Sequence, residues 1–348
     1  MKELNENLSI ESSMVYELLA SMFRLECHEQ LIPSNPEKLK YVSEDITKWV
    51  QRSRAKLTEE MKKELNVFFN WESFLGLCLI QLIWENDCYK EIDAFINFLE
   101  QYPAKDLIKF FFYTGYGEEN MLIQNIEDPI EVKNFLNKAS LPEVEKWKLT
   151  YFASSSEETK IRFIKLVKDF YNLIFKDNLN MLQEAHAKSI EYMTNKLKKE
   201  PYEILQKILG IHLESFNCST ILIPSYYYDI ASNVSCYEDK QRVICLYGTL
   251  RPELEISEDI SPEKIVTAIK ILSDENRMKI IKILNTTPCY GYELSQKLGI
   301  SSSTTSHHVS LLNDIGVIVG IREENKVYYQ VNKDKIRHIL NQFENMLT

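Results

Sequence analysis

Hydrophobic residues recur every three or four positions along most of this chain, which predicts a mainly α-helical protein. The first clear stripe contains Val15, Leu18, Leu19, Met22 and Phe23, and serines at positions 9, 12 and 13 can cap its helix over residues 9–27. Similar stripes predict further helices over residues 37–54, 58–86, 91–101, 104–113, 141–147, 156–175, 179–199 and 201–209, with a short one that starts at Asp128-Pro129. We therefore expect a large helical body in the N-terminal part of the chain.

The periodicity changes after residue 219. Residues 220–228 (TILIPSYYY) and 242–248 (RVICLYG) are rich in β-branched and aromatic side chains, with NVSCYEDKQ between them. Such a pattern predicts a hairpin or a small sheet. An acidic connector, residues 251–260, follows it. The sequence thus divides into a helical sensor or interaction domain (1–215), a small β segment with its connector (216–257) and a C-terminal domain (258–348).

Two helices joined by a tight turn are predicted between residues 290 and 316. The first carries Leu294 and Leu298 and ends at Gly299, a residue suited to the left-handed conformation that closes a helix. Ser301 or Ser302 can cap the second helix, 302–314, whose buried stripe is Thr305, Val309 and Leu312, and Gly316 ends it. This is the pattern of a helix-turn-helix, whose second helix enters the major groove of DNA.

The opposite face of that second helix carries Ser303, Ser306, His307 and Ser310. These short donors and acceptors can reach base edges, whereas an ordinary surface helix carries Glu and Lys. The alternative is a Ser-rich solvated helix with no ligand. His308, on the other side, is expected to be partly buried and structural.

Backbone contacts to DNA are expected at both ends of this motif. Thr304 and the N–H groups near Ser302 are candidates for phosphate binding, because a helix N-terminus attracts anions. After the helix, residues 317–321 and 327–331 alternate as strands around the polar turn 323–326, which predicts a hairpin wing. Arg322 and Lys326 are the wing cations expected to contact the backbone or the minor groove, although two neighbouring glutamates oppose them.

A helix-turn-helix followed by a hairpin is a winged helix, and here the sequence resembles the ArsR/SmtB family of bacterial transcription regulators. The resemblance covers residues 261–347, about a quarter of the chain, and rests on the order and spacing of segments 272–284, 290–301, 303–318 and 327–331. It implies a homodimeric, double-stranded-DNA-binding regulator, more often a repressor than an activator. The segment VYELLASM is more loosely similar to a helical domain of unknown function that precedes some ArsR-type winged helices.

The same resemblance implies a use for the flanking helices. Ser261-Pro262 starts one with Ile265, Ala268, Ile269 and Leu272 in its stripe, and residues 333–346 form the other. In the family these helices pack against the same helices of a second subunit. The alternative is that they pack on this chain's own N-terminal body.

Charge is distributed unevenly along the chain. Net charge is −10, from 41 Lys and Arg against 51 Asp and Glu, but residues 258–348 contain 11 of each, which leaves 30 and 40 for residues 1–257. A neutral winged helix should hold non-specific DNA weakly and depend on hydroxyls and helix N-termini. The N-terminus has no signal-peptide pattern, no apolar run is long enough to span a bilayer, and the seven cysteines match no secreted spacing, so we expect a cytoplasmic protein.

Family-type metal sites are not expected in this chain, nor is any cofactor. One such site needs paired cysteines on the first helix of the motif, where only Cys289 stands. The other needs Asp and His on the last helix, where Lys333 or Lys335 and Met346 stand instead. A zinc site of Cys218, Cys236 and Cys245 with His212 is a weaker alternative, because the spacings match no close pair.

The helical body is much larger than a dimerisation arm requires. It carries no P-loop, GxSxG, HExxH or dinucleotide-binding pattern, so we expect no enzyme. The hypothesis is that it receives a signal, a small molecule or a partner protein, with Tyr226–Tyr228 and Tyr113–Tyr116 as pocket candidates or ordinary packed tyrosines. The alternative function is a protein-interaction scaffold whose winged helix binds protein rather than DNA.

Overall fold

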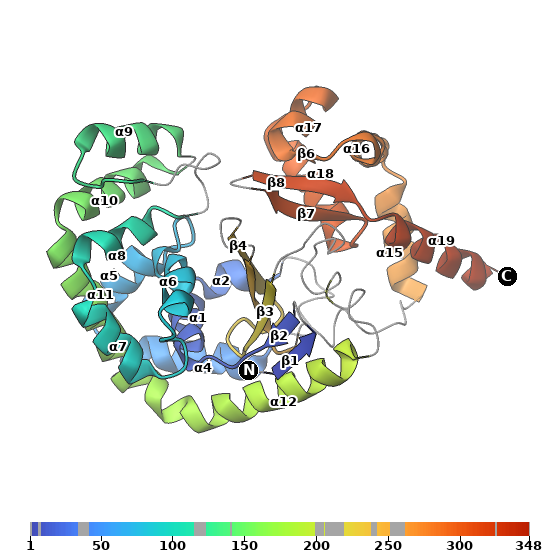
Figure 1. Ribbon diagram of the computed structural model, residues 1–348. Coiled ribbons are helices and arrows are strands. Elements are labelled where there is room, and N and C mark those ends of the chain that lie inside the picture. The colour runs from blue at the N-terminus through green and yellow to red at the C-terminus, as the bar shows by residue number, and fades with distance from the viewer. Residues whose placement is uncertain are drawn as a thin grey trace. The chain divides into compact units, whose positions relative to one another are not determined.

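A computed structural model describes residues 2–5, 8–33, 42–114, 123–139, 141–198, 205, 219–237, 242–250, 262–323 and 326–347 (Figure 1). The chain separates into two compact units. The first contains the N-terminal helices together with residues 219–250, and the second contains residues 262–347. The prediction of a mainly α-helical chain with a small β segment and a C-terminal winged helix-turn-helix is confirmed.

The first unit is built from helices that begin where the sequence places capping residues. Ser13, Ser43, Thr58 and Asp128 each accept a hydrogen bond from a backbone N–H in the first turn of the helix that follows. The helices are α1 (Met14–Glu26), α2 (His28–Leu31), α4 (Glu44–Lys56), α5 (Glu59–Phe69), α6 (Ile80–Glu85), α7 (Ile92–Gln101), α8 (Ala104–Phe111), α9 (Pro129–Lys138), α10 (Glu143–Ser154), α11 (Ser156–Phe170) and α12 (Leu179–Leu197).

Two predicted helices are interrupted. The helix expected over 58–86 breaks after α5, because the Asn70 side chain accepts the N–H of Glu72 and Phe74 takes a left-handed conformation (φ 36°). A 3-10 helix, Leu75–Leu79, then leads into α6. The helix expected over 156–175 is continuous only to Phe170, and its last part, Tyr171–Phe175, is a π-helix.

Apolar side chains from these helices form one large core. Phe68 of α5 lies at its centre, with ring centroids 5.8 Å from Phe111, 5.5 Å from Phe152 and 5.1 Å from Phe163. Helix α1 runs through this core, and each of its residues from 14 to 25 is buried. A helix without a solvent face has no place for an unsatisfied polar group, so each polar residue on α1 needs a partner.

The small sheet, one of the two forms that the sequence predicts for residues 220–248, belongs to the first unit. Strands β3 (Ser219–Ser225) and β5 (Arg242–Gly248) are parallel, and β4 (Ser232–Tyr237) pairs antiparallel with β5. At the other edge, β2 (Leu8–Ile10) pairs parallel with β3, and β1 (Lys2–Asn5) pairs with β2. The residues directly before α1 therefore join a strand more than 200 positions away, which ties residues 219–250 to the helical body.

The second unit is a compact three-stranded winged helix with its own core. It contains α15 (Pro262–Leu272), α16 (Glu275–Thr286), α17 (Gly291–Leu298), α18 (Ser302–Asp314) and α19 (Lys333–Leu347). Its antiparallel sheet has the order β6 (Cys289–Tyr290), β8 (Lys326–Val331), β7 (Ile318–Glu323). Ile280, Leu294, Leu312, Ile318 and Ile339 are buried at the centre of this unit.

None of the described helices combines the length and apolar character that a membrane span requires.

Candidate nucleic-acid interface

The turn between α17 and α18 is held by local hydrogen bonds that the sequence specifies. Gly299 closes α17 at φ 67°, and its N–H donates to the carbonyl of Ser295 at 3.0 Å. Ser301 caps α18, since its hydroxyl accepts the N–H of Thr304 at 3.1 Å. Two residues thus separate the end of one helix from the cap of the next, and α18 has a fixed starting point.

Helix α18 has one buried and one exposed face. Thr305, Val309 and Leu312 are buried in the core of the second unit. Thr304, Ser306, His307, Ser310 and Asn313 are exposed. This is the arrangement expected of a helix that packs on its own domain and presents the other face to a partner.

For the other residues of this helix that were predicted to bind DNA, the structure describes the backbone but not every side chain. Ser302 and Ser303 lie in the first turn of α18, but their side chains lie outside the described part of the structure. The hydroxyl of Thr304 lies 2.7 Å from that of Ser301. Its N–H is taken by the Ser301 cap, so the N–H groups left for a phosphate are those of the positions before it.

His308 is buried, as its position on the apolar side of α18 predicts. Its Nδ1 lies 3.8 Å from Oδ1 of Asp274, the residue that caps α16 by accepting the N–H of Arg277. That backbone N–H, assisted by the charges of Arg277 and His308, lowers the pKa of Asp274 below its usual value. His308 therefore connects α18 to the start of α16 and does not face outward.

The wing is a regular antiparallel hairpin. Ile318 pairs with Val331 at its base, and Arg322 lies opposite Val327. Glu323 pairs with Lys326 beside the turn residues, 324 and 325, which lie outside the described part. The backbone positions of Arg322 and Lys326 are thus at the tip of the wing, while their side chains are not described.

An aromatic group between the wing and α17 was not predicted. The Tyr290 ring lies 5.8 Å from that of Tyr328 and 6.4 Å from that of Tyr292, which is 59% exposed. The sequence signal was the repeated Tyr in CYGYE beside VYYQV, which becomes informative only once β6 is known to pair with β8.

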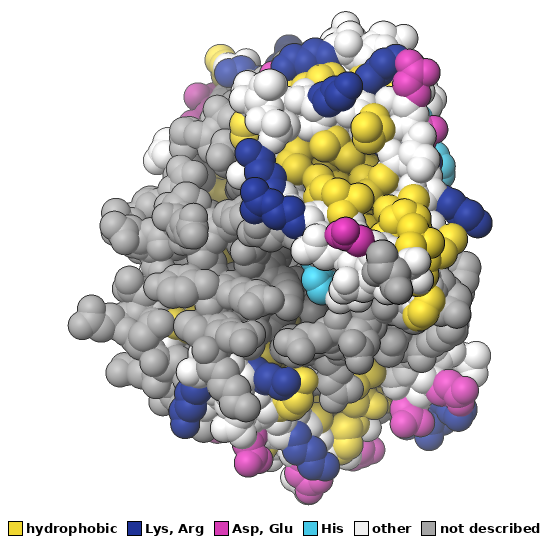
Figure 2. All heavy atoms as spheres, turned by 90° about the vertical axis from the view of Figure 1, so that its right-hand side faces the viewer, with side chains coloured by type: hydrophobic (Ala, Val, Ile, Leu, Met, Phe, Trp, Pro, Cys, Tyr) yellow, Lys and Arg dark blue, Asp and Glu magenta, His cyan; other side chains and the backbone are white. Residues whose placement is uncertain are grey.

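Exposed apolar residues also mark the helices that flank the motif. Helix α15 packs on α19, with Ile265, Ala268 and Ile339 buried between them and the core. Val266 is 37% exposed and Leu340 is 49% exposed, and Met346 and Leu347 extend this exposure along α19. Figure 2, which faces the side where these helices lie, shows hydrophobic side chains gathered with Lys and Arg around them.

Comparison with known proteins bears on the same residues. The sequence model described as "Bacterial regulatory protein, arsR family" matches residues 274–319, from the cap of α16 to the start of β7. The arsenical resistance operon repressor of Staphylococcus aureus is 32% identical over 73 residues, which cover 21% of this chain and 70% of that protein. This chain belongs to the ArsR family.

Other relatives of this ArsR-family chain match a similar share of it. The cadmium resistance transcriptional regulatory protein CadC of Listeria innocua is 35% identical over 72 residues, 20% of this chain, and the match spans 60% of that protein's length. Among solved structures, NolR from Sinorhizobium fredii is similar with 24% identity and a TM-score of 0.21, covering 25% of this chain and 94% of that one. The residues matched by the family model, 274–319, all belong to the second unit.

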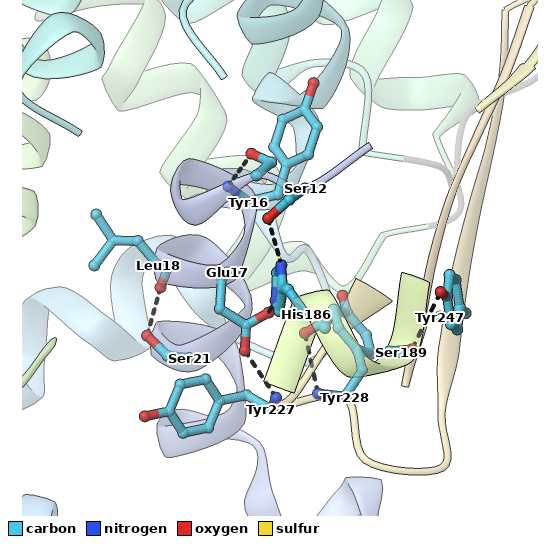
Figure 3. Close-up of polar contacts among 12 residues, drawn as sticks. Ser12, Tyr16, Glu17, Leu18, Ser21, His186, Ser189, Tyr227, Tyr228 and Tyr247 are labelled. Carbon is cyan, nitrogen blue, oxygen red and sulfur yellow. Dashed lines mark hydrogen bonds and ion pairs between the residues drawn. The ribbon is translucent and has the colours of Figure 1, made fainter. Parts of the chain in front are cut away.

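Within the first unit of this ArsR-family chain, a buried polar network joins α1, α12 and the turn after β3 (Figure 3). Glu17 accepts the N–H of Tyr227 at 3.0 Å, and its other oxygen lies 3.2 Å from Nε2 of His186. Nδ1 of that ring lies 3.0 Å from the hydroxyl of Ser12. The sequence signal for this network is a single Glu in the middle of an apolar helix, which does not by itself indicate its partners.

The tyrosines considered as a pocket lining, and the cysteines and histidine considered as zinc ligands, are described by the structure only in part. Tyr227 and Tyr228 are buried beside α1, whereas Tyr116 lies outside the described residues. Cys245 is buried in β5, while Cys218 and His212 lie outside the described part. Among described residues, no three of His, Cys, Asp or Glu come together as a metal-binding group.

Proposed function

We propose that this protein is a DNA-binding transcription regulator that reads a double-stranded operator with α18. The observation that carries the proposal is the exposure of Ser306, His307 and Ser310 on the face opposite the buried Thr305, Val309 and Leu312. These polar groups are short, so they reach base edges only if the helix itself lies in the major groove. Ser303 is proposed to read bases beside them.

Phosphate contacts fix the reading helix on the duplex. Thr304 and the N–H groups of the first turn near Ser302 are proposed to bind one phosphate, since the cap at Ser301 leaves early N–H groups free to donate. Arg322 and Lys326, at the tip of the wing, are proposed to bind backbone on the next groove. With 11 basic and 11 acidic residues from 258 onward, the domain makes few ionic contacts, and its affinity should vary little with salt.

A homodimer supplies the second reading helix. Two copies joined through the exposed apolar residues of α15 and α19 would present two α18 helices to half-sites one helical turn apart, or a multiple of it. We propose repression as the outcome, because the relative from Staphylococcus aureus is named a repressor and a bound dimer excludes other proteins from the same DNA. The first unit is proposed to receive the signal that changes DNA affinity.

Metal sensing is not part of this proposal. Two relatives are named for cadmium and arsenical resistance, but the ArsR-like part of this chain contains a single cysteine, Cys289. That thiol is buried and accepts a hydrogen bond from Lys297 Nζ at 3.1 Å, inside its own unit.

The decisive experiment is selection of binding sites from a random pool of double-stranded DNA with the full chain. We expect enrichment of an inverted repeat, and we expect His307→Ala to weaken binding to that site about 10- to 100-fold. His338→Ala is the matched control, because His338 is also exposed but lies on α19. It should leave the affinity unchanged.

Failure to enrich any motif at low salt would contradict the proposal and favour the protein-interaction scaffold. Enrichment that His307→Ala leaves unaffected would show that DNA is bound by a different surface.

A further inference from the structure

A serine, a glutamate and a histidine from distant parts of the chain form a hydrogen-bonded row in the first unit (Figure 3). Ser12 lies between β2 and α1, Glu17 lies on α1, and His186 lies on α12. The Ser12 hydroxyl is 3.0 Å from Nδ1 of His186, and Nε2 of the same ring is 3.2 Å from Oε2 of Glu17. A hydroxyl, an imidazole and a carboxylate in this order are the arrangement in which a serine is activated as a nucleophile.

The contacts of Glu17 determine where the imidazole proton lies. Oε1 of Glu17 accepts the backbone N–H of Tyr227 at 3.0 Å. Oε2 likewise accepts a hydrogen bond from Nε2 of His186, because a carboxylate has no proton to donate. Nε2 therefore carries the ring proton, and Nδ1 has a lone pair that faces the hydroxyl of Ser12. This is the tautomer that can remove the proton of Ser12.

The three residues differ in their access to solvent. Ser12 is partly exposed, whereas His186 and Glu17 are buried, with exposed fractions of 0% and 1%. A reagent in solution can therefore meet Ser12, while the base and the carboxylate behind it are kept from water. In such surroundings the Glu17 carboxylate stabilises the imidazolium that forms when His186 takes the proton.

The backbone on both sides of Ser12 is held in place. The N–H of Glu11 donates to the carbonyl of Leu222 at 2.9 Å, and the hydroxyl of Ser13 donates to the carbonyl of Tyr89 at 2.6 Å. Because Ser13 is the cap of α1, Ser12 directly precedes the positive end of a 13-residue helix. That end favours the negative charge that develops on the oxygen of an attacked carbonyl group.

We propose that Ser12 is a modification site, an activated nucleophile that takes a small acyl group onto its hydroxyl. Oγ of Ser12 attacks the carbonyl carbon of the acyl donor, and its proton passes to Nδ1 of His186. The bond between that carbon and the leaving group then breaks, and the leaving group departs with the bonding electron pair. The products are an ester on Ser12, an imidazolium paired with Glu17, and the anion of the leaving group.

The burial of His186 decides the class of donor and the fate of the ester. A ring without exposed surface does not reach the leaving group to protonate it. The donor is therefore one whose leaving group departs as an anion, such as a thioester or an acyl phosphate. The same ring does not activate a water molecule, so the ester on Ser12 persists. Because Ser12 is only partly exposed, a short acyl group is favoured.

The probe for this site is p-nitrophenyl acetate, whose leaving group departs as an anion and is measured by its absorbance. The full chain should release one equivalent of nitrophenolate and gain the mass of one acetyl group, which peptide mass spectrometry should locate on Ser12. Hydroxylamine should remove this group, since it cleaves an ester but leaves an acetylated lysine intact.

Two serine variants show whether the row of three residues is required. Ser12→Ala should gain no acetyl group that hydroxylamine removes. Ser154→Ala is the matched control, because Ser154 is more exposed than Ser12 but its hydroxyl donates to the carbonyl of Tyr151 at 2.8 Å and not to a histidine. This control should react like the wild-type chain.

Glu17 is a positioning residue, since it acts through His186, and Glu17→Gln tests that role. The N–H of Tyr227 keeps the amide oxygen at the place of Oε1, so the amide NH₂ faces Nε2 of His186. The ring must then accept at Nε2 and carry its proton on Nδ1, where it no longer removes the proton of Ser12. The maximal rate of acylation should fall at least about 100-fold, while the probe concentration that gives half of that rate stays the same. Circular dichroism checks that this variant is folded.

Each result supports or overturns the proposed acylation. A wild-type chain without an ester on Ser12 after prolonged exposure to the probe would overturn it, whatever the variants do. Release of nitrophenolate far beyond one equivalent would contradict a persistent ester, and an unchanged rate in folded Glu17→Gln would contradict activation through His186. None of these measurements contains DNA, so selection of binding sites tests the proposed function separately.

Discussion

Glu17 is a buried carboxylate whose hydrogen bonds contribute to the stability of the first unit. Its carboxylate joins α1 to the N–H of Tyr227 and to His186 of α12, and it is 1% exposed. Glu17→Ala leaves both partners buried without an acceptor. We expect it to lower the free energy of unfolding of the first unit by about 3 kcal/mol, measured by urea denaturation of the full chain.

Glu44→Ala is the control for this measurement. Glu44 pairs with Lys48 on the surface of α4, where its side chain is 86% exposed. Its removal should change stability by less than about 0.5 kcal/mol. An equally small effect for Glu17→Ala would mean that the network does not hold the helices together.

For single residues, the sequence predicts a hydrogen bond where the two partners are close together in the chain. Ser13 was one of three serines expected to cap α1, and Ser301 one of two expected to cap α18, because a cap and its N–H partner are three positions apart. The partners of Glu17 and Arg24 are 210 and 205 positions away. Such contacts depend on the tertiary fold, so the buried polar contacts of α1 could not be predicted.

Among the elements, the turn of the helix-turn-helix depends on one glycine conformation. Gly299 has φ 67°, and a Cβ added there would meet no atom within 4 Å, so an alanine would be strained only through its backbone. We expect Gly299→Ala to destabilise the second unit by about 1 kcal/mol, measured as a lower Tm of its transition by calorimetry.

Gly291 provides the matched substitution within the same helix. A Cβ added at Gly291 would likewise meet open space, but this glycine begins α17 without a positive φ. Gly291→Ala should leave stability unchanged or raise it slightly, because alanine is the better helix former. Equal losses at both positions would show that the αL conformation is not what makes Gly299 necessary.

Comparing the predicted helices and strands with those of the structure shows which elements the hydrophobic pattern of the sequence can predict. Helix α18 was predicted with the bounds 302–314 that the structure has, since its cap, stripe and terminating glycine are contiguous. For residues 220–248 the sequence predicted a hairpin or a small sheet, and the structure has a small sheet in which β3 and β5 are parallel and β4 pairs antiparallel with β5 at the edge. Parallel strands need a crossover connection between them, and such a connection has no short sequence pattern. Strand β2 joins the sheet from the opposite end of the chain, and its three residues are too few to show the alternation that predicts a strand.

Considered as a whole molecule, this protein requires a second copy if it is to read an inverted repeat. The exposed apolar residues Val266 and Leu340 lie on the two helices that flank the reading motif, and each unit of the chain already has a complete core of its own. In the proposed dimer, these two residues are buried between the subunits.

Val266→Glu combined with Leu340→Glu tests this explanation. Two carboxylates placed in an apolar interface should raise the dimer dissociation constant by at least about 100-fold. Sedimentation velocity at micromolar concentration should then show a monomer with unchanged circular dichroism, and affinity for the selected inverted repeat should fall with it. Met278→Glu, at a 45% exposed position on α16, should leave both the dimer and DNA binding intact. A double variant that sediments like the wild-type dimer would place the subunit contact elsewhere on the chain.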